Sequence, residues 1–462
     1  MYKYKKSIFI FRRDLRLYDN SGLIEAGRLS KNVIPCFIFD PRQIGDHAYR
    51  SLPALRFMCD SLLDLRNQIN QNNGELLVYY GHPTDCIIQL IQEENIEAVF
   101  VNRDYTPFSI QRDQEIETIC KTYQIAFFQS SDLLLIDPEK ALKSDGKPYT
   151  VFTPFYNNAQ KFFVPRPRNL KSHNFLRVKS EQSLENVFSK IKFEHGLKIS
   201  IPGGRKHALK ILSRLGQYAN YKDTRDFPSK NATTLLSAYH KFGTCSIREV
   251  YHRIAETLGD THPLLRQLYW RDFFSHIGYH FPHVFSGSFR QIYDGIEWDN
   301  NAEFFHMWSE GKTGFPIVDA GMRELNQTGY MHNRVRMIVS SFLVKDLRID
   351  WRWGERHFAQ RLVDYDPCVN NGNWQWAAST GCDAQPYFRI FNPWLQQKKF
   401  DRSCIYIHQW IPELHQYEPK IIHNWQQQNK GAAYPAPIVD HYKQSVLTKL
   451  IYKKVATNSE TD

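Results

Sequence analysis

Residues 33–39 have the sequence VIPCFIF, an unbroken apolar run rich in β-branched and aromatic side chains. An alternating pattern would indicate one exposed face, whereas a continuous run predicts a strand that is buried on both faces. Four similar runs occur in the first 130 residues: SIFIF at 7–11, LLVYY at 76–80, AVFV at 98–101 and IAFF at 125–128. Strands buried on both faces predict a parallel sheet covered by helices, and hence an α/β domain over residues 1–130.

Helical patterns surround and follow these runs. Apolar residues recur at spacings of three and four between positions 55 and 69, which predicts a helix that ends at the turn residues 72–74. These residues are Leu55, Met58, Leu62, Leu65 and Ile69. Further helices are expected at 206–221, 264–280 and 332–347. Residues 131–204 are charged and broken by prolines, which is typical of a linker that crosses the surface. We therefore expect an α/β domain at 1–130, a linker at 131–204, a helical domain at 205–450 and a polar tail at 451–462.

The overall composition indicates which partners, metal sites and cellular compartments to expect. A formal charge of +11 and a pI near 9.1 favour a polyanionic partner, although a generally basic surface explains the charge equally well. Eight cysteines occur without a CxxC pair, so we expect neither a disulfide framework nor a metal site, and a reducing compartment. The N-terminal apolar run is too short for a signal peptide, and no stretch reaches the length of a membrane span.

All ten tryptophans lie at or beyond Trp270, so the helical half is expected to have an unusual interior. Two of them follow the pair Asp364 and Asp366 in the sequence DYDPCVNNGNWQW. A helix through Asn370 would place Trp374 on the same face and Trp376 on nearly the opposite one. One face could serve a buried planar cofactor and the other a second planar ligand; a capped helix with incidental aromatics is the alternative.

Three further segments carry polar groups in patterns unusual for a core. In MHNRVRM, 331–337, Asn333 offers an amide to a ring edge and Arg336 is expected to pair with the carboxylate at 364 or 366. Residues 267, 270, 271 and 274 (Gln, Trp, Arg, Phe) form one helical stripe suited to stacking a base. The hydroxyls of 233–237 could hold a phosphate, although a capped helix explains them as well.

Together these segments resemble the photolyase/cryptochrome family, and closely the bacterial class I cyclobutane pyrimidine dimer photolyases. The resemblance covers essentially the whole chain and rests on FRRDLRLYDN (11–20), GKTGFPIVDAGMRELNQTGYMHNRVRM (311–337), DYDPCVNNGNWQWAASTG (364–381) and PYFRIFNP (386–393). It implies an N-terminal antenna-type α/β domain, a linker and an all-helical FAD domain. The implied activity is light-driven splitting of dimers in UV-damaged DNA by electron transfer from photoexcited reduced FAD, without a metal, in a cytoplasmic monomer.

The resemblance also implies roles for individual residues. The expected FAD contacts are Tyr221, Thr233, Thr234, Leu235, Leu236, Ser237, Gln267, Arg271, Asn333, Arg336, Asp364, Asp366 and Asn370. Leu235, which stands where many relatives have arginine, would act through its backbone. Asn370 stands where the family faces flavin N5, and asparagine there is typical of photolyases. The expected lesion contacts are Arg225, Trp270, Arg334, Met337 and Trp376, with Asn333 and Gln267 at the reaction site, and the expected electron-carrying tryptophans are Trp298, Trp351 and Trp374.

Two positions depart from the class I pattern. Gln267 replaces a glutamate, and glutamine there is typical of (6-4) photolyases and animal cryptochromes, which however carry a histidine pair where this chain has His332 and Asn333. We expect the cyclobutane dimer as substrate, repaired less efficiently. Phe108 and Ser109 stand where folate-binding relatives often carry Asn-Glu, so a methenyltetrahydrofolate antenna, a deazaflavin or none remain open. The alternatives are a (6-4) photolyase, a DASH-type cryptochrome and a signalling cryptochrome, which would usually have a longer C-terminal extension.

Overall fold

The computed structural model describes residues 2–170, 173–178, 182–193, 197, 199–428 and 433–458. The chain forms two compact units. The first comprises Met1–Leu197, Ile201–Ala219 and Thr234–His280, and the second comprises Lys198–Ser200, Asn220–Thr233 and Phe281–Asp462. The first unit thus also contains residues 131–197 of the expected linker and two segments of the expected helical domain, 205–219 and 234–280. The limits given above for the functional domains stay a prediction.

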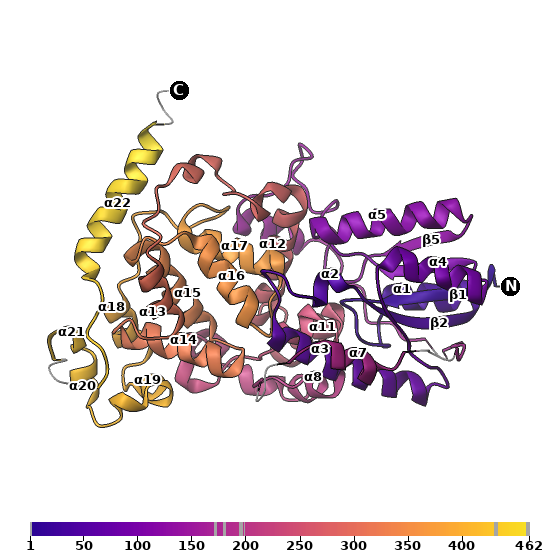
Figure 1. The fold of residues 1–462 in the computed structure, drawn as a ribbon, viewed down its shortest axis with the longest axis horizontal. Helices are drawn as coiled ribbons and strands as arrows, with labels where there is room; N and C mark the ends of the chain where they lie inside the picture. The colour runs from indigo at the N-terminus through magenta and orange to yellow at the C-terminus, as the bar shows by residue number, and fades with distance from the viewer. Residues whose placement is uncertain are drawn as a thin grey trace. The chain divides into compact units, whose positions relative to one another are not determined.

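The first unit contains a parallel sheet in the order β3-β2-β1-β4-β5, of which β1, β2 and β5 are labelled in Figure 1. Its strands are β1 (Tyr4–Phe11), β2 (Ser30–Phe39), β3 (Leu77–Tyr80), β4 (Ala98–Asn102) and β5 (Ala126–Ser130). Every pairing is parallel, so the sheet predicted from the five apolar runs is confirmed. Ile8, Ile34 and Val99 are fully buried.

Helices cover both faces of this sheet. On one face, α4 (Pro83–Glu94) and α5 (Pro107–Thr122) bury Ile87, Leu90 and Ile116 against the strands. On the other, α1 (Ser21–Leu29) approaches so closely that a side chain at Gly22 would meet the ring of Phe9. The helix predicted before residues 72–74 is confirmed as α3 (Leu52–Gln71).

The remaining helices of the first unit are α2 (Pro41–Ile44), α6 (Phe152–Ala159), α7 (Leu184–Lys190), α8 (Arg205–Leu212), η1 (Leu215–Tyr218), α10 (Ser237–Lys241), α11 (Ile247–Leu258) and α12 (Pro263–His280). The predicted helix at 264–280 is confirmed. The predicted helix at 206–221 is wrong in extent: α8 ends at Leu212, and a 3-10 turn containing Gly216 follows, because glycine weakens a helix interior.

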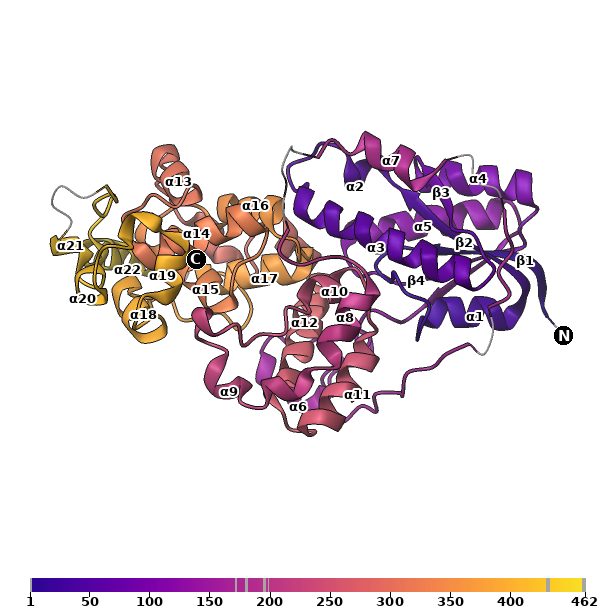
Figure 2. The ribbon, with the colours of Figure 1, turned by 90° about the horizontal axis from the view of Figure 1, so that it is seen from below.

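The expectation that 131–204 only crosses the surface is also wrong for one part. Residues Phe152, Phe155 and Ala159 lie on one face of α6, are nearly or fully buried, and pack against α12 (Figure 2). Helix α6 is only eight residues long, and its apolar spacing is too short to stand out from the charged sequence around it.

The second unit is helical. Its elements are α9 (Tyr221–Thr224), η2 (Pro228–Lys230), η3 (Pro282–Phe285), η4 (Gln291–Gly295), α13 (Ala302–Ser309), α14 (Pro316–Thr328), α15 (Asn333–Ser341), η5 (Phe342–Asp346), α16 (Trp351–Arg361), α17 (Pro367–Ala378), α18 (Pro393–Phe400), α19 (Ile405–Trp410), η6 (Pro412–Leu414), α20 (Pro419–Ile422), α21 (Trp425–Gln428) and α22 (His441–Asn458). Its core encloses the fully buried Trp308, Trp351, Trp374 and Trp425.

Two features of this unit differ from the sequence expectation. The helix predicted at 332–347 changes after Ser341 into a π-helical turn, in which the Leu347 N–H donates to the Phe342 carbonyl. The stretch expected to begin a tail at residue 451 continues α22 as far as Asn458, and 459–462 lie outside the described residues. Within the described ranges no helix is long and apolar enough to cross a membrane. All eight cysteines are buried, and they form no disulfide bond with one another.

Candidate functional site

Helix α17 carries the aspartate–asparagine–tryptophan segment. Asp366 caps its N-terminus by accepting hydrogen bonds from the backbone N–H groups of Cys368 and Val369 at 3.1 and 3.2 Å. Asn370 is buried, and its amide nitrogen donates to the backbone carbonyl and to a side-chain oxygen of Glu355, both at 3.0 Å. Two bonds to α16, which lies beside α17 in Figure 1, therefore fix the orientation of this amide.

Arg336 has the carboxylate partner that was predicted for it. Its Nη2 donates to Asp364 at 3.0 Å, and its Nε donates to the Met331 carbonyl at 2.7 Å. The Asp364 side chain is 4% exposed and that of Arg336 23%. Burial lowers the pKa of Arg336, but the neighbouring carboxylate outweighs it and the pKa is raised, so the guanidinium stays charged.

The start of α15 brings together the residues expected to meet a ring edge or a lesion. His332 caps the helix by accepting from the Arg334 N–H, and burial lowers its pKa to about 4. Asn333 is exposed, and its amide lies 3.9 Å from the sulfur of Met337. Arg334 donates to Asp226 at 3.0 Å and lies over the ring of Phe400.

Two more expected contacts lie on or beside α9. Tyr221 is buried, and burial raises the pKa of its hydroxyl. The guanidinium of Arg225 lies over its ring, 5.8 Å from the centroid. Thr233 belongs to the second unit, as Tyr221 does. The rest of the segment expected to contact FAD belongs to the first unit: Thr234, Leu235, Leu236 and Ser237.

In residues 234–237 the backbone is bent into an unusual conformation. Leu235 has φ of 55°, in the left-handed region that costs free energy for residues other than glycine, and its side chain is 37% exposed. The Leu236 N–H reaches the Thr234 hydroxyl at 3.4 Å, and α10 begins at Ser237. That this position contacts FAD through its backbone stays a prediction.

Helix α12 holds Gln267, Trp270 and Arg271, which are all half-buried. Arg271 donates to the carbonyls of Leu133 and His240 at 2.8 and 3.5 Å. The neighbouring Asp272 is fully buried, and burial raises its pKa to about 7, although it accepts bonds from two backbone N–H groups. These hydrogen bonds anchor α12 and thereby fix the direction in which the stripe of residues 267, 270, 271 and 274 faces.

The tryptophans of the expected electron chain differ in burial. Trp374 and Trp351 are each 2% exposed, and Trp298 is half-buried and packs edge-on against Tyr452, with 6.3 Å between the ring centroids. Trp376, the expected lesion contact, is half-buried. Two of the three expected electron carriers are thus buried and one is partly exposed, and electron transfer through them stays a prediction.

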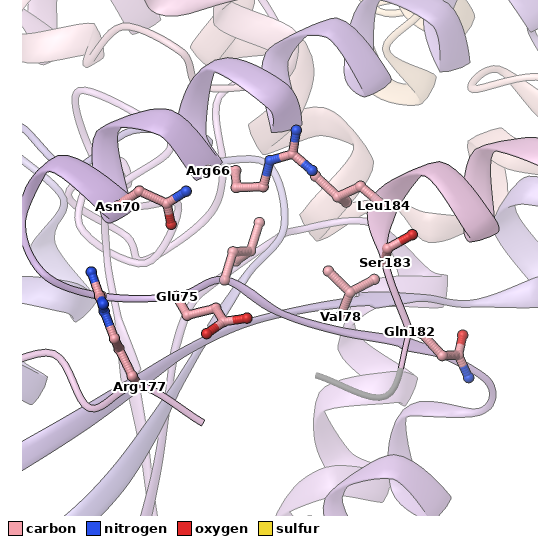
Figure 3. A pocket seen from close by; sticks show the side chains of 10 residues that line it. Arg66, Asn70, Glu75, Val78, Arg177, Gln182, Ser183 and Leu184 are labelled. Atoms are coloured by element: carbon pink, nitrogen blue, oxygen red, sulfur yellow. The ribbon is translucent and has the colours of Figure 1, made fainter. Parts of the chain in front are cut away.

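The first unit also contains the segment considered for an antenna. The ring of Phe108 contacts the guanidinium groups of Arg42 and Arg112 at 4.9 and 6.0 Å, and the Ser109 hydroxyl donates to Asp104 at 3.1 Å. Elsewhere in the unit, a cavity of about 390 Å³ lies between α3, β3 and the start of α7, and Arg66, Glu75 and Arg177 are among the residues that line it (Figure 3). None of the predicted site residues lines it.

Sequence reasoning missed two residues that support the site. Glu355, which fixes the Asn370 amide, is nearly buried, yet lies in a polar stretch that gave no signal. Phe152 stacks on Trp270 with 3.5 Å between ring centroids and 6° between planes. Its spacing from Phe155 and Ala159 was the available signal.

The second unit's groups fit a flavin. A flavin ring presents carbonyl oxygens, ring nitrogens and an N–H along its edges. Arg336 supplies a permanently charged donor that is already held by Asp364, and Asn370 supplies an amide of fixed orientation. Among the described residues, no group of histidine, cysteine and carboxylate side chains is arranged to hold a metal ion.

Comparison with known proteins gives a consistent answer. Residues 7–171 match the family model described as DNA photolyase, and residues 264–454 match the FAD-binding domain of DNA photolyase. A Synechococcus protein named deoxyribodipyrimidine photo-lyase is 37% identical over 97% of this chain and 96% of its own length.

Solved structures agree with this. The crystal structure of an archaeal photolyase from Sulfolobus tokodaii, described with two FAD molecules and a novel light-harvesting cofactor, is 42% identical with a TM-score of 0.88, covering 97% of this chain and all of the other. A cryptochrome structure from Synechocystis is 28% identical with a TM-score of 0.85, covering 98% of this chain and 100% of the other.

The chain thus combines an α/β unit with a parallel sheet and, later in the sequence, a match to the FAD-binding domain of DNA photolyase, which defines it as an FAD-binding protein. The chain belongs to the DNA photolyase family.

Proposed function

We propose that this protein is a deoxyribodipyrimidine photo-lyase, which binds UV-damaged DNA and splits cyclobutane pyrimidine dimers under light. The observation that carries the proposal is the identity of 37% over nearly the full length to a protein of that name. The net charge of +11 supports a polyanionic partner. Bound FAD in its reduced form would supply, on excitation, the electron that opens the cyclobutane ring.

The residues of this chain then have distinct tasks. Arg336, held by Asp364, would donate to the flavin ring together with Asn370. Tyr221, the 233–237 segment, Gln267, Arg271, Asn333 and Asp366 would complete the FAD contacts. No general base is needed for a reaction of this kind.

The lesion contacts would stack and steady a dimer that has been turned out of the duplex, because a dimer is already poorly stacked and is therefore cheap to extrude. Trp270 and Trp376 are both partly exposed indoles, as stacking requires. Met337, Arg225 and Arg334 would lie beside the lesion. Trp298, Trp351 and Trp374 would carry an electron inward by hopping between oxidisable indoles.

We further propose that the protein acts as a monomer in the cytoplasm. We also propose that the α/β unit binds an antenna chromophore. The candidates for this chromophore are a second FAD, a folate and a deazaflavin. Denaturing the purified protein and separating its chromophores by chromatography identifies which one it carries. Recovery of a single FAD per chain and nothing else would contradict the antenna proposal.

The test of function uses purified protein with its flavin reduced in the absence of oxygen. One oligonucleotide carries a cyclobutane thymine dimer and another a (6-4) photoproduct, and restored thymines are counted after illumination. Light-dependent repair of the first alone is expected. Repair of the second alone would move the protein to the (6-4) class, and repair of neither would favour a signalling cryptochrome.

Gln267 decides how well the repair proceeds. A glutamine amide can donate to the dimer, but it cannot supply a proton as glutamic acid can. The Gln267→Glu variant is therefore expected to give a higher repair yield per absorbed photon. An unchanged yield would contradict the inefficiency assigned to glutamine at this position.

A further inference from the structure

Helix α6 lies in the stretch expected to be a linker. One of its aromatic rings packs against Trp270, an expected contact of the DNA lesion. Phe152 lies face to face with Trp270 of α12, with 3.5 Å between ring centroids and 6° between planes. Phe152 is 1% exposed, whereas Trp270 remains partly exposed. One face of the indole is therefore covered by Phe152. The ring of Phe274 also packs against the indole, with 5.7 Å between centroids and 28° between planes, and the part of Trp270 that stays exposed is left for contact with another molecule.

Phe152 is itself held in place from several directions. Its ring stacks on Tyr156 at 5.7 Å and meets Phe273 edge-on at 5.7 Å. The guanidinium of Arg266 lies 5.1 Å from its centroid and 5.0 Å from that of Tyr156. Residues from two helices thus fix the plane of Phe152, and Phe152 in turn fixes the plane of Trp270.

We infer that Phe152 is a positioning residue for lesion recognition, which acts through Trp270. This inference rests on the proposed function of Trp270 as a stacking surface for the dimer. An indole already held flat loses little conformational freedom when a base stacks on it, so more of the stacking free energy remains as affinity. Phe152 also keeps the dimer away from the face that it covers, so the dimer would meet the exposed part of the indole.

The experiment compares three variants of the full-length, flavin-loaded protein. Phe152→Leu keeps an apolar side chain but removes the flat face. Phe152→Tyr keeps the flat face. Phe155→Leu is the matched control, because Phe155 is also on α6 and 1% exposed. Its ring contacts Phe152, Phe273 and His276 but has no direct ring contact with Trp270.

The first measurement is Kd for an oligonucleotide with one thymine dimer and for the undamaged sequence. Phe152→Leu is expected to bind the dimer about 2- to 10-fold more weakly, the range of an aromatic pair, with little change for undamaged DNA. Phe152→Tyr and Phe155→Leu should keep the wild-type preference. An unchanged dimer affinity in Phe152→Leu, or an equal loss in Phe155→Leu, would overturn the inference.

A second measurement is independent of DNA. Protein labelled with 5-fluorotryptophan gives a ¹⁹F signal for residue 270, which is assigned by its loss in Trp270→Phe. Phe152→Leu should shift this signal because the ring current of the stacked phenyl is removed, whereas Phe155→Leu should not. A wild-type protein without preference for the dimer would refute the proposed function, and the ¹⁹F signal would then decide the positioning role separately.

Discussion

The ion pair between Arg336 and Asp364 gives a sharp test of what holds the proposed flavin site together. In Asp364→Asn the shape is kept and the charge is lost. Breaking a buried pair costs about 3–5 kcal/mol, and a hydrogen bond to a charged group contributes about 1.5–3 kcal/mol. Arg336 is 23% exposed and keeps its bond to the Met331 carbonyl, so water compensates in part. We expect a loss of about 2–3 kcal/mol in the free energy of unfolding.

Tryptophan fluorescence isolates this effect, because Trp270 lies in the first unit and the other nine tryptophans lie in the second. With a urea dependence of about 2–3 kcal/mol per molar, the midpoint should fall by about 1 M. The control is Glu413→Gln, in the same unit, whose carboxylate is 35% exposed and pairs with Arg323; about 1 kcal/mol or less is expected. A loss in Asp364→Asn no larger than that of the control would refute the reasoning.

Three further predictions follow from the second unit. Burial raises the pKa of Glu324 from 4.5 in the unfolded chain to about 7 in the folded protein, so the folded protein binds this proton more tightly. The protonated carboxyl therefore contributes fully to the free energy of unfolding below pH 4.5, and this contribution is lost as the pH rises to about 7. Glu324→Gln should flatten that decline in urea unfolding and be more stable than wild type at pH 8; an equal slope would contradict the shift. Gly354→Ala should cost about 1–3 kcal/mol in thermal unfolding, because its Cβ would lie within 2.2 Å of the Trp374 ring; a smaller change would mean that Trp374 moves freely. Trp374→Phe should abolish photoreduction of oxidised flavin but leave repair by chemically reduced protein intact; retained photoreduction would exclude Trp374 from the electron chain.

Much of the fold follows from local pattern. The five strands were predictable because each is a continuous apolar run, and burial on both faces leaves a parallel sheet as the outcome. The Arg336–Asp364 pair was predictable because a charged group at the head of an apolar helix needs a partner, although the choice between Asp364 and Asp366 was not.

What the sequence did not disclose depends on distant packing. Phe152 meets Trp270 more than one hundred residues away in sequence, and no local periodicity records such a contact. Glu355 is a polar residue in a polar stretch, and only the arrival of Asn370 beside it gives it a role. The left-handed backbone at Leu235 was likewise unpredictable, because leucine has no preference for that region.

The π-helical turn at Phe342–Asp346 has a consequence for tolerance to insertion and deletion. Such a turn contains one residue more than an α-helical turn, so the residues after it are out of phase with those before it by about 100°. Lys345 reaches the Ala378 carbonyl and the Ser379 hydroxyl, and Asp346 pairs with His441, only in this phase. Because an α-helical turn with one residue fewer ends in the same phase, loss of a single codon here should convert the turn to α-helix and leave both side chains directed toward α17 and α22, whereas the same loss in a regular α-helical turn would rotate the residues after it by about 100°.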